Sequence, residues 1–147
     1  MAEIIHRIGI ASTAEDVYQL LTTDEGLSLW WTTDTQGAGD IGSIITFNFN
    51  TAKVKFRVTA LVPNQRVQWQ HTGDMPDEWI GTEISFELTY KNNQTYVLFK
   101  HMKWRQASDF MGHCSCKWAV FLLSLKNALE NGKGNPFPND IHIEHGE

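Results

Sequence analysis

One long amphipathic segment near the end of the chain constrains the fold more than any other feature. Its apolar residues recur three or four positions apart, the spacing of a single helix face, as Phe110, Cys114, Trp118, Phe121, Leu122, Leu125 and Leu129. Leucines make up its C-terminal part, whereas Trp118 and Cys114 lie beside His113 in its N-terminal part. The spacing predicts one long helix that ends at Gly132 and Gly134. The change in composition predicts plain core at one end and a mixed aromatic and polar surface at the other.

In the segment before this helix, apolar residues recur at every second position, which is typical of strands with one buried face. Five such strands are expected, with inward residues Ile45, Phe47 and Phe49; Val54, Phe56, Val58 and Ala60; Val67, Trp69 and His71; Ile84, Phe86 and Leu88; Val97, Phe99 and His101. Asn92-Asn93 predicts a tight hairpin, because Asn tolerates positive φ. A register shift of one residue would turn His71 and His101 outward.

The first part of the chain predicts a strand followed by two short helices. Ile4, Ile8 and Ile10 mark the strand, Ser12 to Glu15 fits a capping box, and Asp24 is expected to cap the second helix. Residues 32–42 are expected to form a loop. The order predicts a single α+β domain over residues 1–147, in which a curved antiparallel sheet of about six strands wraps on the long C-terminal helix.

Composition excludes several classes of protein. The chain has 12 basic and 17 acidic residues, a net charge of −5, and no basic run, so nucleic-acid binding is disfavoured. No stretch approaches the length of a membrane span, and residues 1–9 lack the apolar core of a signal peptide. Cys114 and Cys116 point in different directions on a helix and cannot readily pair. We therefore expect a reduced, cytoplasmic protein.

Several motifs resemble the START-like (SRPBCC) superfamily and, within it, the branch related to the Hsp90 ATPase activator (AHSA1-like proteins). They are Ala14–Leu21 with Trp30-Trp31, Pro63–Trp69, Gly81-Thr82 with Phe86–Leu88, Thr95–Val97 with His101, and Trp118 with Leu129–Gly134. Their order spans nearly the whole chain. The resemblance implies a helix-grip fold with a cavity between the long helix and the sheet. Members bind or transform varied hydrophobic molecules, so the fold alone does not identify the function.

The inward residues near the helix define a candidate ligand site. We expect it to include Trp31, Phe47, Phe49, Phe56, Trp69, His71, Trp79, Phe86, Phe99, His101, Cys114 and Trp118. His101 is either a polar contact for a ligand or a hydrogen-bonded core residue, and for His71 we favour the core. Trp79 lies among acidic residues, where burial is not expected; it either covers the cavity mouth or packs on the base of its own loop.

Other chemistry at this site is less well supported. His113, Cys114 and Cys116 are potential zinc ligands, but their spacing does not fit a structural zinc site, so no metal and no cofactor are expected. Catalytic residues stay unknown, with His101 as a weak candidate for an acid/base and Cys114 for a nucleophile. Buried free cysteine is the simpler interpretation of Cys114.

Three functions remain open at this level. The preferred one is binding of a small hydrophobic or aromatic molecule. The second is an enzyme of the cyclase or hydrolase type that uses His101 in the same cavity. The third is a regulator that associates with an Hsp90-type chaperone, for which an exposed Trp79 would be the expected anchor. A homodimer is compatible with each.

Overall fold

The computed structural model describes residues 2–50 and 52–144, so residues 1, 51 and 145–147 of the predicted domain lie outside the described part. Within it, seven strands form one sheet in the order β1-β7-β6-β5-β4-β3-β2. The strands are β1 (Ala2–Ile10), β2 (Thr35–Gln36), β3 (Ile44–Phe49), β4 (Ala52–Val62), β5 (Arg66–His71), β6 (Glu83–Lys91) and β7 (Gln94–Trp104), each antiparallel to its neighbours. The helical elements are α1 (Ala14–Thr22), α2 (Asp24–Trp30), the 3-10 turn η1 (Asp77–Trp79) and α3 (Asp109–Asn131).

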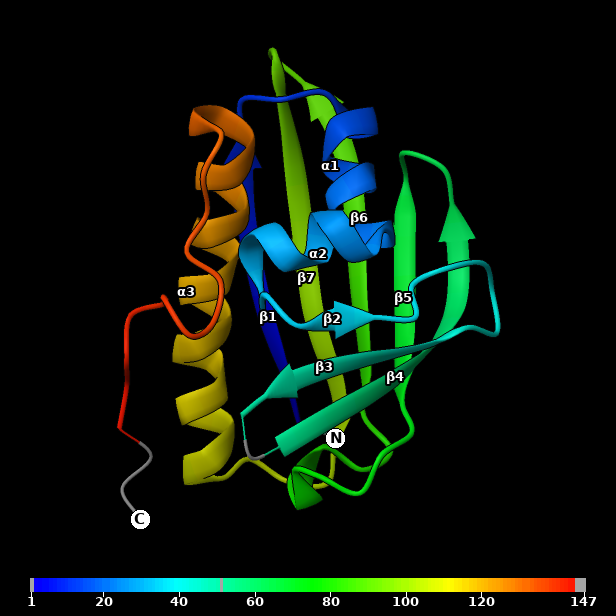
Figure 1. Cartoon of the computed structure of the whole chain (residues 1–147), viewed down its shortest axis with the longest axis vertical. Coiled ribbons are helices and arrows are strands. Elements are labelled where there is room, and N and C mark those ends of the chain that lie inside the picture. The colour runs from blue at the N-terminus through cyan, green and yellow to red at the C-terminus, as the bar shows by residue number, and fades with distance from the viewer. Residues whose placement is uncertain (1, 51, 145–147) are drawn as a thin grey trace.

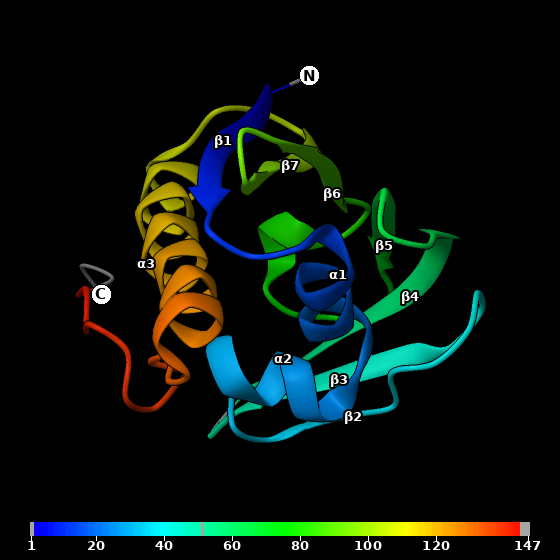
Figure 2. The same ribbon diagram turned by 90° about the horizontal axis from the view of Figure 1, so that it is seen from above.

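The long helix α3 runs along β1, while α1 and α2 lie against the concave side of the sheet (Figure 1). Seen from above, the sheet curves around these two short helices, with α3 beside them (Figure 2). The predicted α+β helix-grip architecture is confirmed. The sheet gains β2, a two-residue strand paired with β3 inside the segment that was expected to be loop.

Both helix caps lie one residue from their predicted positions. Thr13 Oγ1 accepts the Asp16 N–H at 3.2 Å, and Thr23 Oγ1 accepts the Gly26 N–H at 2.9 Å. The predicted caps at Ser12 and Asp24 are therefore wrong. Threonine is also a favoured N-cap. The Asp24 carboxylate instead accepts the Ala38 N–H at 2.8 Å, which ties down the loop before β3.

The strand register follows the predicted alternation. Asn92 and Asn93 both have positive φ, at 55° and 62°, and form the hairpin between β6 and β7. His71 and His101 both point inward, with exposed fractions of 5% and 0%. Their burial confirms the register on which the candidate site depends.

After α3 the chain turns back along the same helix. Gly132 ends the helix with φ 79°, the left-handed conformation that glycine adopts without strain. At Gly134 a Cβ atom would lie 2.4 Å from the Leu29 carbonyl oxygen, so the close passage beside α2 requires glycine. Phe137 then forms an isolated bridge with Thr32, and the following residues run down beside α3 (Figure 1). Among the described residues no helix is long and apolar enough to cross a membrane.

Candidate ligand pocket

An apolar pocket of about 390 Å³ lies where the N-terminal half of α3 faces the ends of β3 and β4. Five of the predicted site residues line it, namely Trp31, Phe49, Trp79, Cys114 and Trp118. The walls also include residues that the predicted site did not contain: Ala52, Val54, Pro76, Phe110, His113, Lys117, Phe121, Phe137, Pro138, Asp140, His142 and Ile143. Of these, Val54, Phe110 and Phe121 belong to the predicted apolar faces. The long helix, the sheet, the loop after β5 and the C-terminal tail all contribute to one site.

The other predicted site residues form a packed aromatic layer behind the pocket wall. These are Phe47, Phe56, Trp69, His71, Phe86, Phe99 and His101, all of them buried. Trp31 links the layer to the pocket, because its ring lies 4.1 Å from Phe47 and 4.9 Å from Trp118 between centroids. The sequence pattern identified the inward face correctly, but it did not distinguish the residues on the pocket surface from those one layer deeper.

His101 lies in a buried chain of hydrogen bonds that crosses the site. The Trp118 indole N–H donates to His101 Nδ1 at 3.1 Å, so in the neutral ring Nε2 carries the proton and donates to Thr82 Oγ1 at 2.9 Å. The Thr82 hydroxyl donates in turn to the Trp79 carbonyl at 2.6 Å. Burial, with a smaller effect from the nearby His71, lowers the pKa of His101 to about 3. The imidazole is therefore neutral at physiological pH, and both of its nitrogens are occupied.

His71 and His101 both contact the Trp79 ring. The centroid distances to Trp79 are 6.2 Å for His71 and 4.8 Å for His101. His71 Nε2–H donates to the Met75 carbonyl at 2.8 Å, and its Nδ1 has no partner among the described residues. Burial lowers the pKa of His71, against the opposing effects of the Met75 carbonyl and of Asp74. The histidine pair thus supports the Trp79 loop.

Cys114 lies in the pocket wall as a neutral thiol. Burial raises its pKa to about 12; the nearby Trp79 indole N–H acts in the opposite direction, and Glu78 adds to the rise. That indole N–H approaches the thiol without making a hydrogen bond of normal geometry to any described residue. Burial thus disfavours the thiolate that the nucleophilic role considered for Cys114 requires.

Trp79 itself is 8% exposed and covers one side of the pocket from the loop between β5 and β6. Its ring is stacked on Trp118, with centroids 6.0 Å apart and planes inclined by 16°. Of the two alternatives left open by the sequence, the structure matches the one in which this tryptophan folds over the cavity. Asp74 and Asp77 are exposed and Glu78 is bound by Ser108, which explains how a loop of such composition carries a buried tryptophan.

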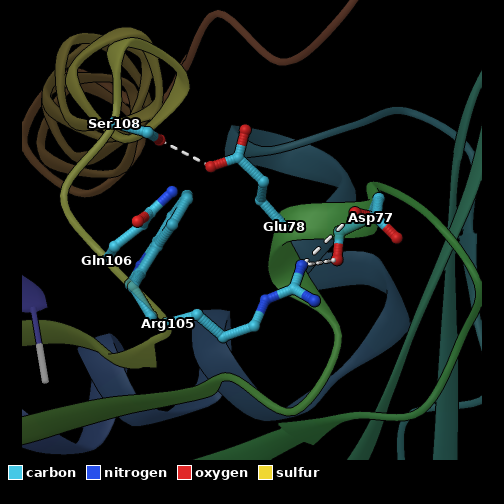
Figure 3. A pocket seen from close by; sticks show the side chains of 6 residues that line it. Asp77, Glu78, Arg105, Gln106 and Ser108 are labelled. Atoms are coloured by element: carbon cyan, nitrogen blue, oxygen red, sulfur yellow. Dashed lines mark hydrogen bonds and ion pairs between the residues drawn. The ribbon is translucent and has the colours of Figure 1, made fainter.

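A second, polar hollow of about 500 Å³ lies on the outer side of this loop and is lined by Asp77, Glu78, Trp104, Arg105, Gln106 and Ser108. Arg105 Nη2 donates to the Asp77 carbonyl at 2.9 Å and reaches its carboxylate at 3.3 Å (Figure 3). Ser108 Oγ donates to Glu78 Oε1 at 2.5 Å and also caps α3 (Figure 3). The charged and hydroxyl groups of this hollow bind one another, and they fasten the Trp79 loop to the start of α3.

The C-terminal tail forms the outer wall of the apolar pocket. The Phe137 ring packs 5.2 Å from Phe49, and the Asn135 N–H donates to Ser124 Oγ at 2.7 Å. Lys117 forms an ion pair with Asp140, whose side chain is 6% exposed, and also donates to the Ile141 carbonyl at 3.0 Å. These contacts were not predicted because the tail has no period. The only indication in the sequence that the tail packs on the domain was the Pro136-Phe137-Pro138 segment.

The comparison with protein families decides where this chain belongs. The model of the family described as activator of Hsp90 ATPase homolog 1-like protein matches residues 11–130, which extends from just before α1 to the last turn of α3. The chain belongs to this AHSA1-like family. The resemblance derived from the motifs is thereby confirmed. No curated protein matches at a comparable level.

Solved structures agree with the AHSA1-like assignment. The chain is similar to the Aha1 dimer from Colwellia psychrerythraea, with 58% identity, a TM-score of 0.86, and coverage of 91% of this chain and 100% of that one. It has the same fold as MLL2253 from Mesorhizobium loti, with 16% identity, a TM-score of 0.78, and coverage of 88% and 98%. It also matches CalU16 from Micromonospora echinospora, with 17% identity, a TM-score of 0.77, and coverage of 97% and 74%.

Metal chemistry was the remaining alternative from the sequence. His113, Cys114 and Cys116 lie within a single turn of α3, with Cys114 buried and Cys116 exposed. Within residues 2–50 and 52–144 no three His, Cys, Asp or Glu side chains are grouped closely enough to hold a metal ion. In this AHSA1-like chain the apolar pocket is therefore the feature on which a functional proposal is built.

Proposed function

We propose that this AHSA1-like chain binds a small, largely hydrophobic molecule with an aromatic part in the pocket under α3. The observation that carries the proposal is a pocket of about 390 Å³ beside a core whose other aromatic side chains are closely packed. Ligand sites are typically cavities of this size, with apolar walls and few polar groups. The flat faces of Trp31, Trp79 and Trp118 favour an aromatic ring, which stacks on such surfaces.

The polar groups in the wall indicate what else the molecule carries. The Trp79 indole N–H has no hydrogen-bond partner among the described residues, so a carbonyl, ether or hydroxyl oxygen would satisfy it. At the mouth, Lys117 and Asp140 already neutralise each other. An uncharged molecule with one acceptor oxygen fits this environment better than an ion, because a buried unpaired charge is costly.

A matched pair of variants on β4 tests the proposal. Ala52 lines the pocket, whereas Ala60 is similarly half-buried on the same strand and does not. We expect Nile red, an uncharged aromatic dye, to bind the unmodified protein and Ala60→Trp, and not Ala52→Trp. Native mass spectrometry of protein purified from its own host then gives the mass of the natural ligand. Equal dye binding by both variants would contradict a role for this pocket.

The second candidate function is regulation of an Hsp90-type chaperone. It is favoured by the description of the matching family and by the 58% identity to a structure described as Aha1. The anchor expected from the sequence, an exposed Trp79, is not available because this residue is buried. Measurement of chaperone ATPase activity with and without the protein tests the candidate, and an unchanged rate together with no co-purification would remove it.

We further propose that the protein works as a homodimer in the cytoplasm. The similar Colwellia protein was solved as a dimer. Cys114 and Cys116 are both free thiols, which suits a reducing compartment. Sedimentation velocity over a wide range of protein concentrations tests the dimer, and a single monomeric species throughout would exclude it.

A further inference from the structure

The C-terminal tail is attached to the domain in two unequal parts. In the first part, the Phe137 N–H donates to the Trp31 carbonyl at 2.7 Å, and the Phe137 carbonyl accepts the Thr33 N–H at 3.1 Å. The second part, residues 140–144 and hereafter the strap, contains no helix or strand and makes no backbone-to-backbone hydrogen bond with the described part of the domain. The firm attachment of the tail therefore ends before the strap begins.

A single side chain of α3 fastens the strap. Lys117 forms an ion pair with Asp140 and donates to the Ile141 carbonyl at 3.0 Å. Within residues 2–50 and 52–144, every hydrogen bond and ion pair between the strap and the domain involves this lysine. The ion pair between His142 and Glu144, at 3.4 Å, lies within the strap and does not fasten it.

The strap covers the apolar pocket from the solvent side. Asp140, His142 and Ile143 all line the pocket. Ile143 is half-buried, whereas Ile141 is 69% exposed, so one face of the strap is directed to the pocket and the other to water. Figure 2 shows the end of the tail outside α3, on the side of the helix away from the sheet. A molecule that enters the pocket must therefore displace the strap or another wall.

The other walls are held more firmly than the strap. Trp79 is stacked on Trp118, and its loop accepts hydrogen bonds from several side chains, namely His71, Thr82, Arg105 and Ser108. The remaining walls belong to α3, to the sheet and to the first part of the tail, whose backbone hydrogen bonds would have to break. Local opening uses the segment with the fewest such contacts, and around this pocket that segment is the strap.

We propose that the strap is a gate, which swings away from α3 when the Lys117–Asp140 pair opens, admits the hydrophobic molecule and closes over it with Ile143. The proposal rests on the ligand binding proposed above and adds the route of entry and the residues that control it. Because the same ion pair fastens the strap before and after binding, the gate determines how fast a molecule enters and leaves and has little influence on affinity.

A charge-removing substitution in the strap tests the gate. Asp140→Asn keeps the size of the side chain and removes its charge. We expect the association and dissociation rate constants of Nile red both to rise about fivefold, the factor expected for loss of one partly exposed ion pair. The dissociation constant should stay within about twofold, since the two changes cancel. Glu83→Gln is the matched control, because it removes the carboxylate of the Lys103–Glu83 pair, which does not line the pocket. Stopped-flow fluorescence measures both rate constants.

Two further measurements examine the fastening itself. Reversal of the pair, with Lys117→Glu and Asp140→Lys in one chain, should restore the slow rates, which neither single substitution does. In the protein without dye, the heteronuclear NOE of the amides of residues 141–144 should fall in Asp140→Asn and stay unchanged in Glu83→Gln. An unchanged NOE in both variants would contradict fastening by this ion pair.

The outcomes separate the gate from the binding site. If Nile red does not bind the unmodified protein, the proposed ligand binding fails, and the gate fails with it. If the dye binds and Asp140→Asn has the rates of Glu83→Gln, the gate alone fails. A faster dissociation with an unchanged association rate would make the strap a fixed wall and would also overturn the gate. Should Asp140→Asn not fold, about 1 M NaCl replaces the substitution, because screening weakens the pair in the unmodified protein and should raise both rates.

Discussion

The two halves of α3 show how one helix can close a core at one end and leave it open at the other. In the C-terminal half, Leu122 and Leu125 are fully packed against the rest of the core. In the N-terminal half, Cys114 and Trp118 occupy the same face and border the pocket. Both halves have the same helical spacing, so the difference comes from side-chain shape. Flexible branched leucines fill the space between layers, whereas rigid planar rings leave gaps.

Polar groups follow the same division. Around the C-terminal half, hydrogen bonds hold the helix to β1 through Lys126, to Ala11 just after β1 through Glu130, and to the tail through Ser124. Around the N-terminal half, indole and imidazole groups form the buried chain from Trp118 to the Trp79 carbonyl. The first set fixes the position of the helix. The second set fixes the shape of the pocket wall.

The largest expected difference between the halves is in the cost of shortening a core side chain. Leu125→Ala should lower the free energy of unfolding by about 2–5 kcal/mol, because it leaves an enclosed cavity. Cys114→Ala removes a sulfur atom from a wall that already borders open space, so the loss should be about 1 kcal/mol or less. Urea denaturation measures both values. Equal losses would mean that the two halves are equally packed.

The buried hydrogen-bond chain gives the next effect. Trp118→Phe removes the donor to His101 Nδ1 and should cost about 1–3 kcal/mol through the unsatisfied nitrogen, in addition to the lost ring contacts. Trp104→Phe is the control, since the Trp104 indole N–H has no partner among the described residues. Denaturation of both variants in parallel should show the larger loss for Trp118→Phe. The reverse order would indicate that ring packing, rather than the hydrogen bond, dominates.

The lowered pKa of His101 predicts a pH dependence of stability. Below pH 6.5 the unfolded chain binds a proton at this residue, whereas the folded protein does not until about pH 3. The contribution of His101 to the free energy of unfolding is therefore complete above pH 6.5. On acidification below that pH it falls by about 1.4 kcal/mol per pH unit. His71 acts in the same direction.

His101→Gln separates the two histidines in that experiment. Denaturation of this variant between pH 6.5 and 5 gives its free energy of unfolding as a function of pH. The slope of that dependence should be smaller by the equivalent of one bound proton, whatever the change in absolute stability. A slope unchanged from that of the unmodified protein would mean that His101 is not held neutral in the fold.

The smallest effect on stability is expected for the ion pair between Arg105 and Asp77, which holds the Trp79 loop. Arg105→Ala should change the free energy of unfolding by no more than about 0.5 kcal/mol, because Arg105 and Asp77 are both well exposed. It should nevertheless accelerate dissociation of Nile red, since Trp79 is released from one of its anchors. Stopped-flow fluorescence measures the rate, with Arg57→Ala on the exposed side of β4 as control. Identical dissociation rates would show that the loop is held without this ion pair.

The spacing of apolar residues along the sequence predicted most of the fold, because it directly reflects which side chains are buried. It placed α3, the five long strands after α2, and the inward histidines. It did not place β2, because a two-residue strand has no period, and it placed both N-caps one residue away, because Ser, Thr and Asp serve nearly equally in that position. The seven-stranded sheet follows from tertiary pairing with β3.

The candidate site was predicted less completely, for a geometric reason. Alternation shows which side chains point inward, but the pocket surface depends on how three layers meet. Phe47 and Phe49 share a face of β3, yet Phe49 lines the pocket and Phe47 is buried behind it. Lys117 and Asp140 border the pocket although they are charged, because they neutralise each other. The ligand assignments therefore stay predictions until binding is measured.

The stacked tryptophans have a consequence for spectroscopy. Trp31 is parallel to Trp69 within 2° at 6.3 Å, and Trp79 is nearly parallel to Trp118. At such separations excited states are shared between neighbouring indoles, so light absorbed by one ring is emitted or quenched through another. A molecule that enters the pocket would alter the optical response of the whole network, and near-ultraviolet circular dichroism would report its arrival without any added label.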